Sequence, residues 1–176
     1  MDADEPSEDA HVERVAQLLS GAGRTLAVAE SLTGGQLSTA FAAAAASSQW
    51  YRGAIVAYSS EVKHDLLEVP PGPVVSESCA AAMAQGACAR LGADLALSVT
   101  GVGGPDPQDD QPPGTVWMAV HDHRHGTTVT KVHHFPGGPD EVVARTCSCA
   151  IEWLSSQVRT HTATGTDRVE EPGRQP

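Results

Sequence analysis

Ser31 occupies a position suited to nucleophilic attack. It lies in the segment AESLTGG (residues 29–35), directly after a short apolar run and before a Gly-Gly pair. A hydroxyl between a strand and a helix can project into a site, where free backbone N–H groups near Thr33, Gly34 and Gly35 could hold an oxyanion or a phosphate. A serine before a helix can also serve only as its N-cap. The pattern therefore predicts either a nucleophile or a capping residue.

Lys63 is the candidate base for such a serine. A lysine can accept a proton when burial or a cationic neighbour lowers its pKa, whereas arginine stays protonated. The chain contains two Lys against nine Arg, so a Lys just past a predicted strand favours a deprotonatable amine. A lysine on the solvated face of a short helix is the alternative. Tyr58, five residues earlier, could relay a proton, stack on a flat ring or simply end the strand.

A glycine-rich turn at residues 100–104 (TGVGG) is the third candidate. Glycines let backbone amides approach a ligand closely at the carboxyl edge of an open α/β sheet. We therefore expect Thr100, Gly101 and Gly104 to contact a substrate. The turn is neither a Walker motif, because no Gly-Lys-Ser/Thr follows, nor a dinucleotide fingerprint, because a strand rather than a helix follows.

Two clusters could in principle hold a metal ion. His121, His123 and His125 alternate at strand spacing and would share one face, but such a run at a hairpin tip is more typical of a solvated edge. The acidic loop could offer carboxylates to Mg²⁺ through Asp106, Asp109 and Asp110, and a solvated loop is again favoured. We predict no metal and no other cofactor.

The elements that would position these residues alternate between strand and helix. Strands are predicted at residues 25–29, 53–58, 93–100, 115–121 and 127–135, the last two forming a hairpin. Helices are predicted after Ser7 as far as Gly21, at 37–46, after Ser60, from Ser76 to Leu91, and at 139–158. Apolar strands alternating with helices are typical of an α/β domain whose sheet is covered on both faces. The hairpin makes the predicted sheet mixed and mostly parallel.

Length and charge exclude several classes of protein. The 176 residues suit one domain, predicted at 8–158, between disordered tails at 1–7 and 159–176. The formal charge of −11 would repel a phosphate backbone, so nucleic-acid binding is not expected. No stretch approaches the roughly 20 apolar residues that span a bilayer, and the acidic N-terminus is unlike a signal peptide. We expect a cytoplasmic protein that binds no membrane and whose four cysteines are reduced and buried.

Taken together and in order, four segments resemble one known family. They are AESLTGG (29–35), GAIVAYSSEVK (53–63), VSESCAAAMAQGACARLGADLALSVTGVGGP (75–105) and PPGTVWMAV (112–120). The chain resembles the CinA C-terminal domain family, the nicotinamide-nucleotide amidohydrolases or NMN deamidases. The resemblance implies a stand-alone three-layer α/β/α domain that hydrolyses the carboxamide of nicotinamide mononucleotide (NMN). It also implies self-association, with a dimer as the expected form.

The family pattern also implies roles for residues of this chain. It places the nucleophile at Ser31, its base at Lys63 and a helper at Tyr58. The proposed mechanism adds backbone N–H groups near Thr33, Gly34 and Gly35 as oxyanion donors. The 5′-phosphate of the nucleotide substrate would lie against the turn from Thr100 to Gly104 or against a helix start.

The chain departs from the family pattern at several positions. Ser60 stands where the family usually has Asn, and Gly138 and Pro139 stand where it has Asp and Arg. Val143 replaces a further arginine, for which Arg145 is the nearby candidate substitute. Two alternatives therefore stay open. The chain could hydrolyse another small amide, or it could be a non-catalytic nucleotide-binding or interaction protein of the same fold.

Overall fold

Apolar strands and helices alternate along the chain and assemble into three layers. The computed structural model describes residues 7–163. Its strands are β1 (Leu26–Glu30), β2 (Tyr51–Val56), β3 (Leu95–Gly101), β4 (Thr115–Asp122) and β5 (Thr127–His134). Its helices are α1 (Glu8–Ala22), α2 (Gln36–Ala43), α3 (Ser47–Trp50), α4 (Ser60–Leu67), α5 (Glu77–Leu91) and α6 (Pro139–Ala163). Within these residues no helix is both long enough and apolar enough to cross a membrane.

The five strands form one sheet in the order β2-β1-β3-β4-β5. β1 lies between β2 and β3 and pairs with both in parallel, whereas β4 is antiparallel to β3 and to β5. All described strands except β4 therefore run in the same direction, and the prediction of a mixed, mostly parallel sheet is confirmed. Because β1, β2 and β3 are parallel, the residues that follow them meet at one edge of the sheet.

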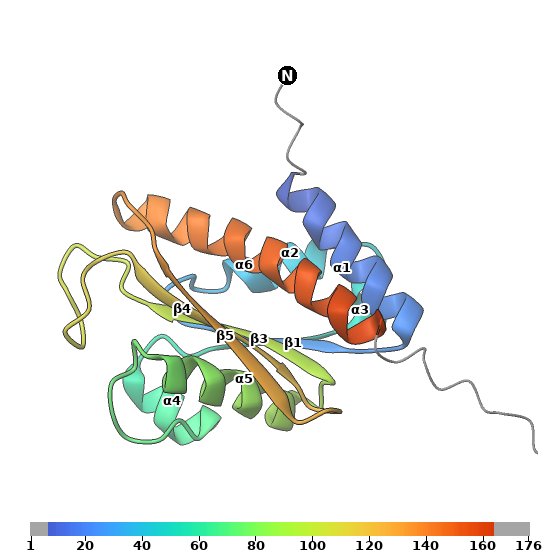
Figure 1. The fold of residues 1–176 in the computed structure, drawn as a ribbon, viewed down its shortest axis with the longest axis horizontal. Coiled ribbons are helices and arrows are strands. Elements are labelled where there is room, and N and C mark those ends of the chain that lie inside the picture. The colour runs from blue at the N-terminus through green and yellow to red at the C-terminus, as the bar shows by residue number, and fades with distance from the viewer. Residues whose placement is uncertain (1–6, 164–176) are drawn as a thin grey trace, which may run out of the picture.

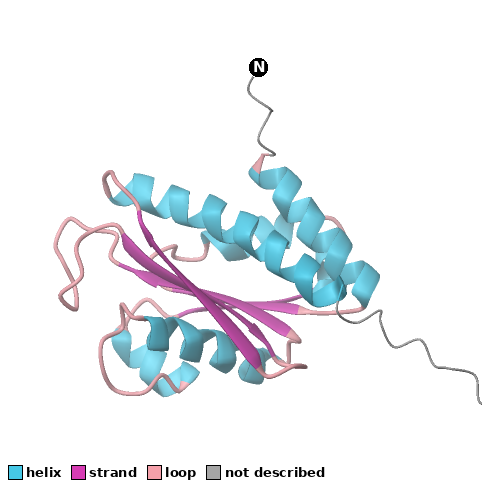
Figure 2. Cartoon of the chain, viewed as in Figure 1, coloured by secondary structure: helices cyan, strands magenta, loops and turns pink. Residues whose placement is uncertain are grey.

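Helices cover both faces of the sheet (Figures 1 and 2). Helices α1, α2, α3 and α6 lie on one face, and α4 and α5 lie on the other. The first face carries large side chains such as Leu26, Val28 and Leu97, which pack with Leu19 and Ile151 from the helices. Burial of these apolar side chains is the main stabilising contribution to the domain. The predicted three-layer α/β/α architecture is confirmed.

The second face of the sheet is built from small residues. Ala27, Ala29, Ala96 and Ala119 line it, and the alanine-rich helix α5 packs against them. Helix α4 in turn lies close against α5, because a Cβ at Gly86 would overlap the carbonyl oxygen of Leu67. Small residues on the sheet and on α5 thus let α4, which carries Lys63, pack closely against the rest of the domain.

The structure corrects several details of the predicted elements. Strand β2 begins and ends two residues earlier than predicted, at Tyr51 and Val56, and it is a partly exposed edge strand rather than a buried one. The cap of α4 is Ser59, whose hydroxyl accepts the N–H of Val62, and not Ser60. The short helix α3 was not predicted; it places Trp50 in the core, where the indole N–H donates to the Ala45 carbonyl oxygen at 3.2 Å.

The ends of the chain also differ from the prediction. Helix α6 continues to Ala163, so the predicted tail does not begin at residue 159. The remainder of the two predicted tails, residues 1–6 and 164–176, lies outside the described residues. All four cysteines are free thiols, but Cys149 is only half-buried, unlike the other three, and lines a pocket together with residues of α1.

Candidate active site

Ser31 follows β1 directly and lies on the wall of a small cavity. The cavity has a volume of about 230 Å³, and Ser31 is 7% exposed. The Ser31 hydroxyl makes no hydrogen bond within the described residues. Helix α2 has Gly35 at its N-cap position, without a side-chain cap. The capping alternative for Ser31 is therefore wrong, and its hydroxyl is available to a ligand.

Glu30 takes over the capping of this helix. Its side chain is fully buried, and its carboxylate accepts the N–H groups of Gly35, Leu37 and Ser38 at 2.7–3.1 Å. It also accepts the Thr33 hydroxyl at 2.8 Å. A carboxylate at a helix N-terminus is favoured by the helix dipole and by charge-assisted hydrogen bonds. The sequence analysis missed this role, although an acid at the end of an apolar strand was the available signal.

The turn after Ser31 uses two of the three amides that were expected to hold an oxyanion. The N–H of Gly34 donates to the Ser31 carbonyl oxygen at 3.1 Å, and that of Gly35 donates to Glu30 at 3.0 Å. By contrast, the N–H groups of Leu32 and Thr33 have no acceptor within residues 7–163. Leu32 also lines the cavity. The free donors in this turn are therefore those of Leu32 and Thr33.

Lys63 is buried on the inner face of α4, with 2% of its surface exposed. This position excludes the alternative of a solvated lysine. Burial lowers the pKa of the Lys63 amine, while the neighbouring Cys79 and Asp109 act in the opposite direction. Its Nζ donates to the Tyr58 carbonyl oxygen at 3.4 Å. No hydrogen bond joins Lys63 to Ser31 in the described part of the chain, and Lys63 does not line the cavity.

Tyr58 follows strand β2 and lies at the mouth of the cavity. Its side chain is 73% exposed and contributes to the cavity lining. Its hydroxyl makes no hydrogen bond to Ser31 or Lys63, or to any other described residue. An exposed ring without a fixed hydroxyl partner can stack on a flat ligand. The geometry thus favours stacking over proton relay for Tyr58.

The glycine-rich turn after β3 forms another wall of the cavity. Gly101, Val102, Gly103 and Gly104 all line it. A Cβ at Gly101 would lie 2.6 Å from the Thr115 carbonyl oxygen, so this close approach requires glycine. The N–H groups of Gly103 and Gly104 have no acceptor among the described residues and remain available to a ligand.

Two polar side chains near this turn are already engaged. The Thr100 hydroxyl donates to the Val74 carbonyl oxygen at 2.6 Å, so it does not face a substrate as expected. The Asp109 carboxylate accepts the N–H groups of Val74 and Val75 at 2.7 and 2.9 Å. Asp109 therefore fixes the acidic loop against the chain before α5, and its part of the loop is not simply solvated.

The charge of the cavity is set by a few side chains. Asp106 and Gln108 line it from the acidic loop, and Pro139 and Val143 line it from α6. Arg145 is exposed on α6 and is not part of the lining. Arg145 lies two positions after Val143, which is a rotation of about 200° around the helix, so its side chain does not take the place of the arginine that the family has at position 143. Within the described residues, the cavity wall contains neither Lys nor Arg.

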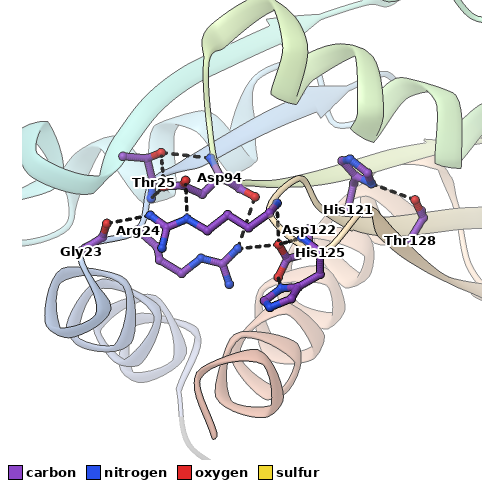
Figure 3. Close-up of polar contacts among 9 residues, drawn as sticks. Gly23, Arg24, Thr25, Asp94, His121, Asp122, His125 and Thr128 are labelled. Carbon is purple, nitrogen blue, oxygen red and sulfur yellow. Dashed lines mark hydrogen bonds and ion pairs between the residues drawn. The ribbon is translucent and has the colours of Figure 1, made fainter. Parts of the chain in front are cut away.

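The histidine-rich hairpin lies at the opposite edge of the sheet. Asp122 ends β4 beside the first residue of β3, and its carboxylate accepts Arg24 at 2.7 Å and lies 2.9 Å from His125 (Figure 3). His121 is buried, with its Nδ1 2.9 Å from the Thr128 hydroxyl oxygen. Residues 7–163 bring together no group of three or more potential metal ligands. His125 thus contacts the Asp122–Arg24 ion pair and His121 contacts Thr128, whereas the His123 ring packs against the His121 ring at a centroid distance of 6.2 Å.

Comparison with known proteins agrees with this architecture. A family profile described as the CinA C-terminal domain matches residues 8–158. The chain belongs to the CinA C-terminal domain family. A CinA-like protein of Geobacter sp. (strain M21) is 42% identical over 158 residues, which are 86% of this chain and 38% of that protein. A CinA-like protein of Mycobacterium sp. (strain JLS) is 40% identical over 84% of this chain and 36% of its own length.

The chain thus spans little more than a third of the curated CinA-like proteins it matches. Solved structures of the CinA superfamily agree in size as well as fold. The competence damage-inducible protein A of Klebsiella pneumoniae subsp. pneumoniae MGH 78578 is 35% identical with a TM-score of 0.83, over 88% of this chain and 98% of that one. A CinA superfamily protein from Enterobacter cloacae is 27% identical with a TM-score of 0.85, over 90% and 96%.

Proposed function

We propose that the chain is an amidohydrolase that converts nicotinamide mononucleotide and water to nicotinate mononucleotide and ammonia. The observation that carries this proposal is the state of Ser31. Its hydroxyl makes no hydrogen bond to residues 7–163 and Ser31 lines a small polar cavity, while Glu30 performs the capping for which a serine there would otherwise serve. Membership of the CinA C-terminal domain family supports the same reaction.

In the proposed reaction, Ser31 Oγ attacks the carboxamide carbon as its proton passes to neutral Lys63. Burial of Lys63 supports this role because it favours the neutral amine. Lys63 Nζ bonds to the Tyr58 carbonyl in the free protein, so the transfer requires a bridging water or a short movement of the side chain. The oxyanion would accept hydrogen bonds from the N–H groups of Leu32 and Thr33, which have no acceptor among the described residues.

Collapse of this intermediate breaks the C–N bond. The Lys63 ammonium returns its proton to the departing nitrogen, which leaves as ammonia, and an ester remains on Ser31. Water then attacks the ester carbon and gives a proton to Lys63, and the nicotinate product leaves as Ser31 recovers its hydroxyl. The two half-reactions use the same acid and base, so a single amine suffices.

A second substrate class is favoured by one observation. The described cavity wall contains Asp106 and no cationic side chain, which is an unfavourable setting for a phosphate dianion. The same Ser31 chemistry on a small amide that lacks phosphate would avoid this repulsion. The second candidate is therefore an amidase that acts on another small amide.

The test is turnover by purified protein. Incubation with nicotinamide mononucleotide should release ammonia and nicotinate mononucleotide in equal amounts. Ser31→Ala and Lys63→Ala should each lower kcat by at least a hundredfold, by removal of the nucleophile or its base. Ser60→Ala, an exposed serine three residues before Lys63, is the matched control and should retain activity. No turnover by the parent chain would refute the proposed function, and turnover in both variants would refute the mechanism.

A further inference from the structure

The cavity beside Ser31 combines one carboxylate with one exposed aromatic ring. Asp106 and Tyr58 both line it and both are exposed to solvent. Lys63 is buried outside the lining, and Arg145 is exposed away from it. In the described part of the chain, no cationic side chain therefore neutralises Asp106 at the cavity wall.

This pair of side chains suits a ligand that is both flat and positively charged. A carboxylate attracts a cation by Coulomb interaction, and the interaction is stronger beside a protein wall than in bulk water. The face of a tyrosine ring also attracts a cation, through the negative potential above its π-system. A pyridinium carboxamide satisfies both groups at once, because its ring is planar and carries the charge.

A phosphate gains much less from the same cavity. The N–H groups of Gly103 and Gly104, which have no acceptor within residues 7–163, are available as donors, but Asp106 follows Gly104 by only two positions. Repulsion between the Asp106 carboxylate and a phosphate dianion opposes what the two amides contribute. The wall thus offers attraction for the ring and little net attraction for the phosphate.

We propose that this site selects its substrate by the positive charge of a pyridinium ring, held between Asp106 and Tyr58, and that phosphate contributes little to recognition. The substrate class is an N1-substituted nicotinamide cation, with or without a phosphorylated ribose. This inference rests on the proposed function for the reaction, although ring binding can be measured without it.

The first experiment compares three amides under steady-state conditions. Nicotinamide mononucleotide has the cation and the phosphate, nicotinamide riboside has the cation alone, and nicotinamide is neutral. We expect kcat/KM for the first two to agree within about threefold and to exceed that for nicotinamide at least tenfold. A preference of more than tenfold for the mononucleotide over the riboside would overturn the proposal, as would equal turnover of nicotinamide.

The second experiment changes the charge of the wall. Asp106→Asn should raise KM for both cationic substrates about five- to tenfold, with kcat little changed, and should leave nicotinamide unaffected. The matched control is Asp110→Asn, an exposed residue of the same loop outside the lining, which should stay within twofold of the parent. Unchanged KM in Asp106→Asn would contradict the proposed contact.

The third experiment separates this inference from the proposed function. Binding of 1-methylnicotinamide and of nicotinamide is measured by calorimetry on the parent chain, on Asp106→Asn and on Tyr58→Leu. We expect the cation to bind the parent at least fivefold more tightly than nicotinamide, and each variant to lose most of that difference. If no amide is hydrolysed but the cation preference holds, the proposed reaction fails and the recognition stands. Equal binding of the two probes to the parent overturns the recognition whatever the activity.

Discussion

The Thr33 hydroxyl donates to Glu30 Oε2 at 2.8 Å, and this contact spans the residue expected to act as nucleophile. The same carboxylate accepts three backbone N–H groups at the start of α2. Ser31 and Leu32 therefore lie in a turn that is closed by hydrogen bonds between Glu30, which precedes them, and Thr33 and Gly35, which follow them. Because Glu30 is fully buried and does not line the cavity, we regard it as a positioning residue for Ser31.

Replacement of Glu30 should affect both stability and catalysis. Glu30→Ala leaves a buried hydroxyl and three N–H groups without their acceptor, and should lower the free energy of unfolding by about 3 kcal/mol or more. Glu30→Gln retains one acceptor oxygen and should lie between Glu30→Ala and the parent. Urea denaturation measures the free energy of unfolding of the parent and of both variants.

The catalytic readout distinguishes positioning from general stability. At a temperature where each variant is fully folded, kcat should fall at least tenfold in Glu30→Gln, because the nucleophile and the oxyanion donors are displaced. KM should change little, because Tyr58 and the turn from Gly101 to Gly104 are not held by Glu30. Glu61→Gln, an exposed acid on α4, is the control. Parent-like kcat in a folded Glu30→Ala protein would contradict the positioning role.

The pH dependence of activity should reflect the buried amine of Lys63. Its pKa is lowered from the ordinary value of 10.5, chiefly by burial, and only the neutral form accepts the Ser31 proton. We expect kcat/KM to rise with pH along a limb whose midpoint lies below 10.5. Lys63→Arg should lower kcat/KM at least a hundredfold, because arginine keeps the positive charge but cannot act as the base. Full activity of the arginine variant would show that Lys63 acts only as a cation.

Stability should respond to the same group with a defined sign. Between the lowered pKa of Lys63 and 10.5, the unfolded chain binds more protons than the folded chain, so the free energy of unfolding rises with pH in that window. Lys63→Met removes the cost of burying the charged amine and should raise the free energy of unfolding at pH 7. Denaturation of both proteins at pH 7 and at pH values approaching 10 checks this; loss of stability in Lys63→Met would contradict it.

The sequence was informative where local pattern decides structure. The apolar runs predicted all five described strands to within a few residues, and Ser76 caps α5 as expected. The positions and hydrogen-bond partners of the side chains at the strand ends could not be predicted from the sequence. An acid at the end of an apolar strand is the one local signal for Glu30 as the cap of α2, and nothing local shows that Gly35 donates to Glu30 instead of to a ligand. The position of Val143 toward the cavity, and of Arg145 away from it, depends on how α6 lies across the sheet.

The close packing of α4 on α5 makes a second stability prediction. Gly86→Ala would place a methyl group against the backbone of Leu67, and backbone cannot move aside without shifting α4. We expect a loss of about 1–3 kcal/mol and, because α4 carries Lys63, a fall in kcat. Gly21→Ala on α1 is the matched control: a Cβ there meets nothing within 4 Å, so better helix propensity should stabilise it by up to about 1 kcal/mol. Equal effects of the two substitutions would contradict the packing argument.

The network at the other edge of the sheet should govern acid stability. Burial alone would raise the pKa of Asp122, but hydrogen bonds from Arg24 and His125 outweigh it and hold that pKa well below its usual range (Figure 3). The lowered pKa stabilises the fold above the unfolded value near 3.8, and this contribution is lost as pH falls from there toward the folded pKa.

Asp122→Asn tests this network directly. It leaves the buried Arg24 guanidinium beside a neutral amide, and should cost about 3 kcal/mol at pH 7. Below about pH 4 the parent's advantage should begin to shrink, because Asp122 binds a proton in the unfolded chain while its carboxylate stays ionised in the folded chain. Asp65→Asn, an exposed acid on α4, should change neither stability nor its pH dependence. Thermal unfolding from pH 3 to 7 measures all three proteins, and a difference between parent and Asp122→Asn that stayed constant over that range would show that the charge of Asp122 does not stabilise the fold.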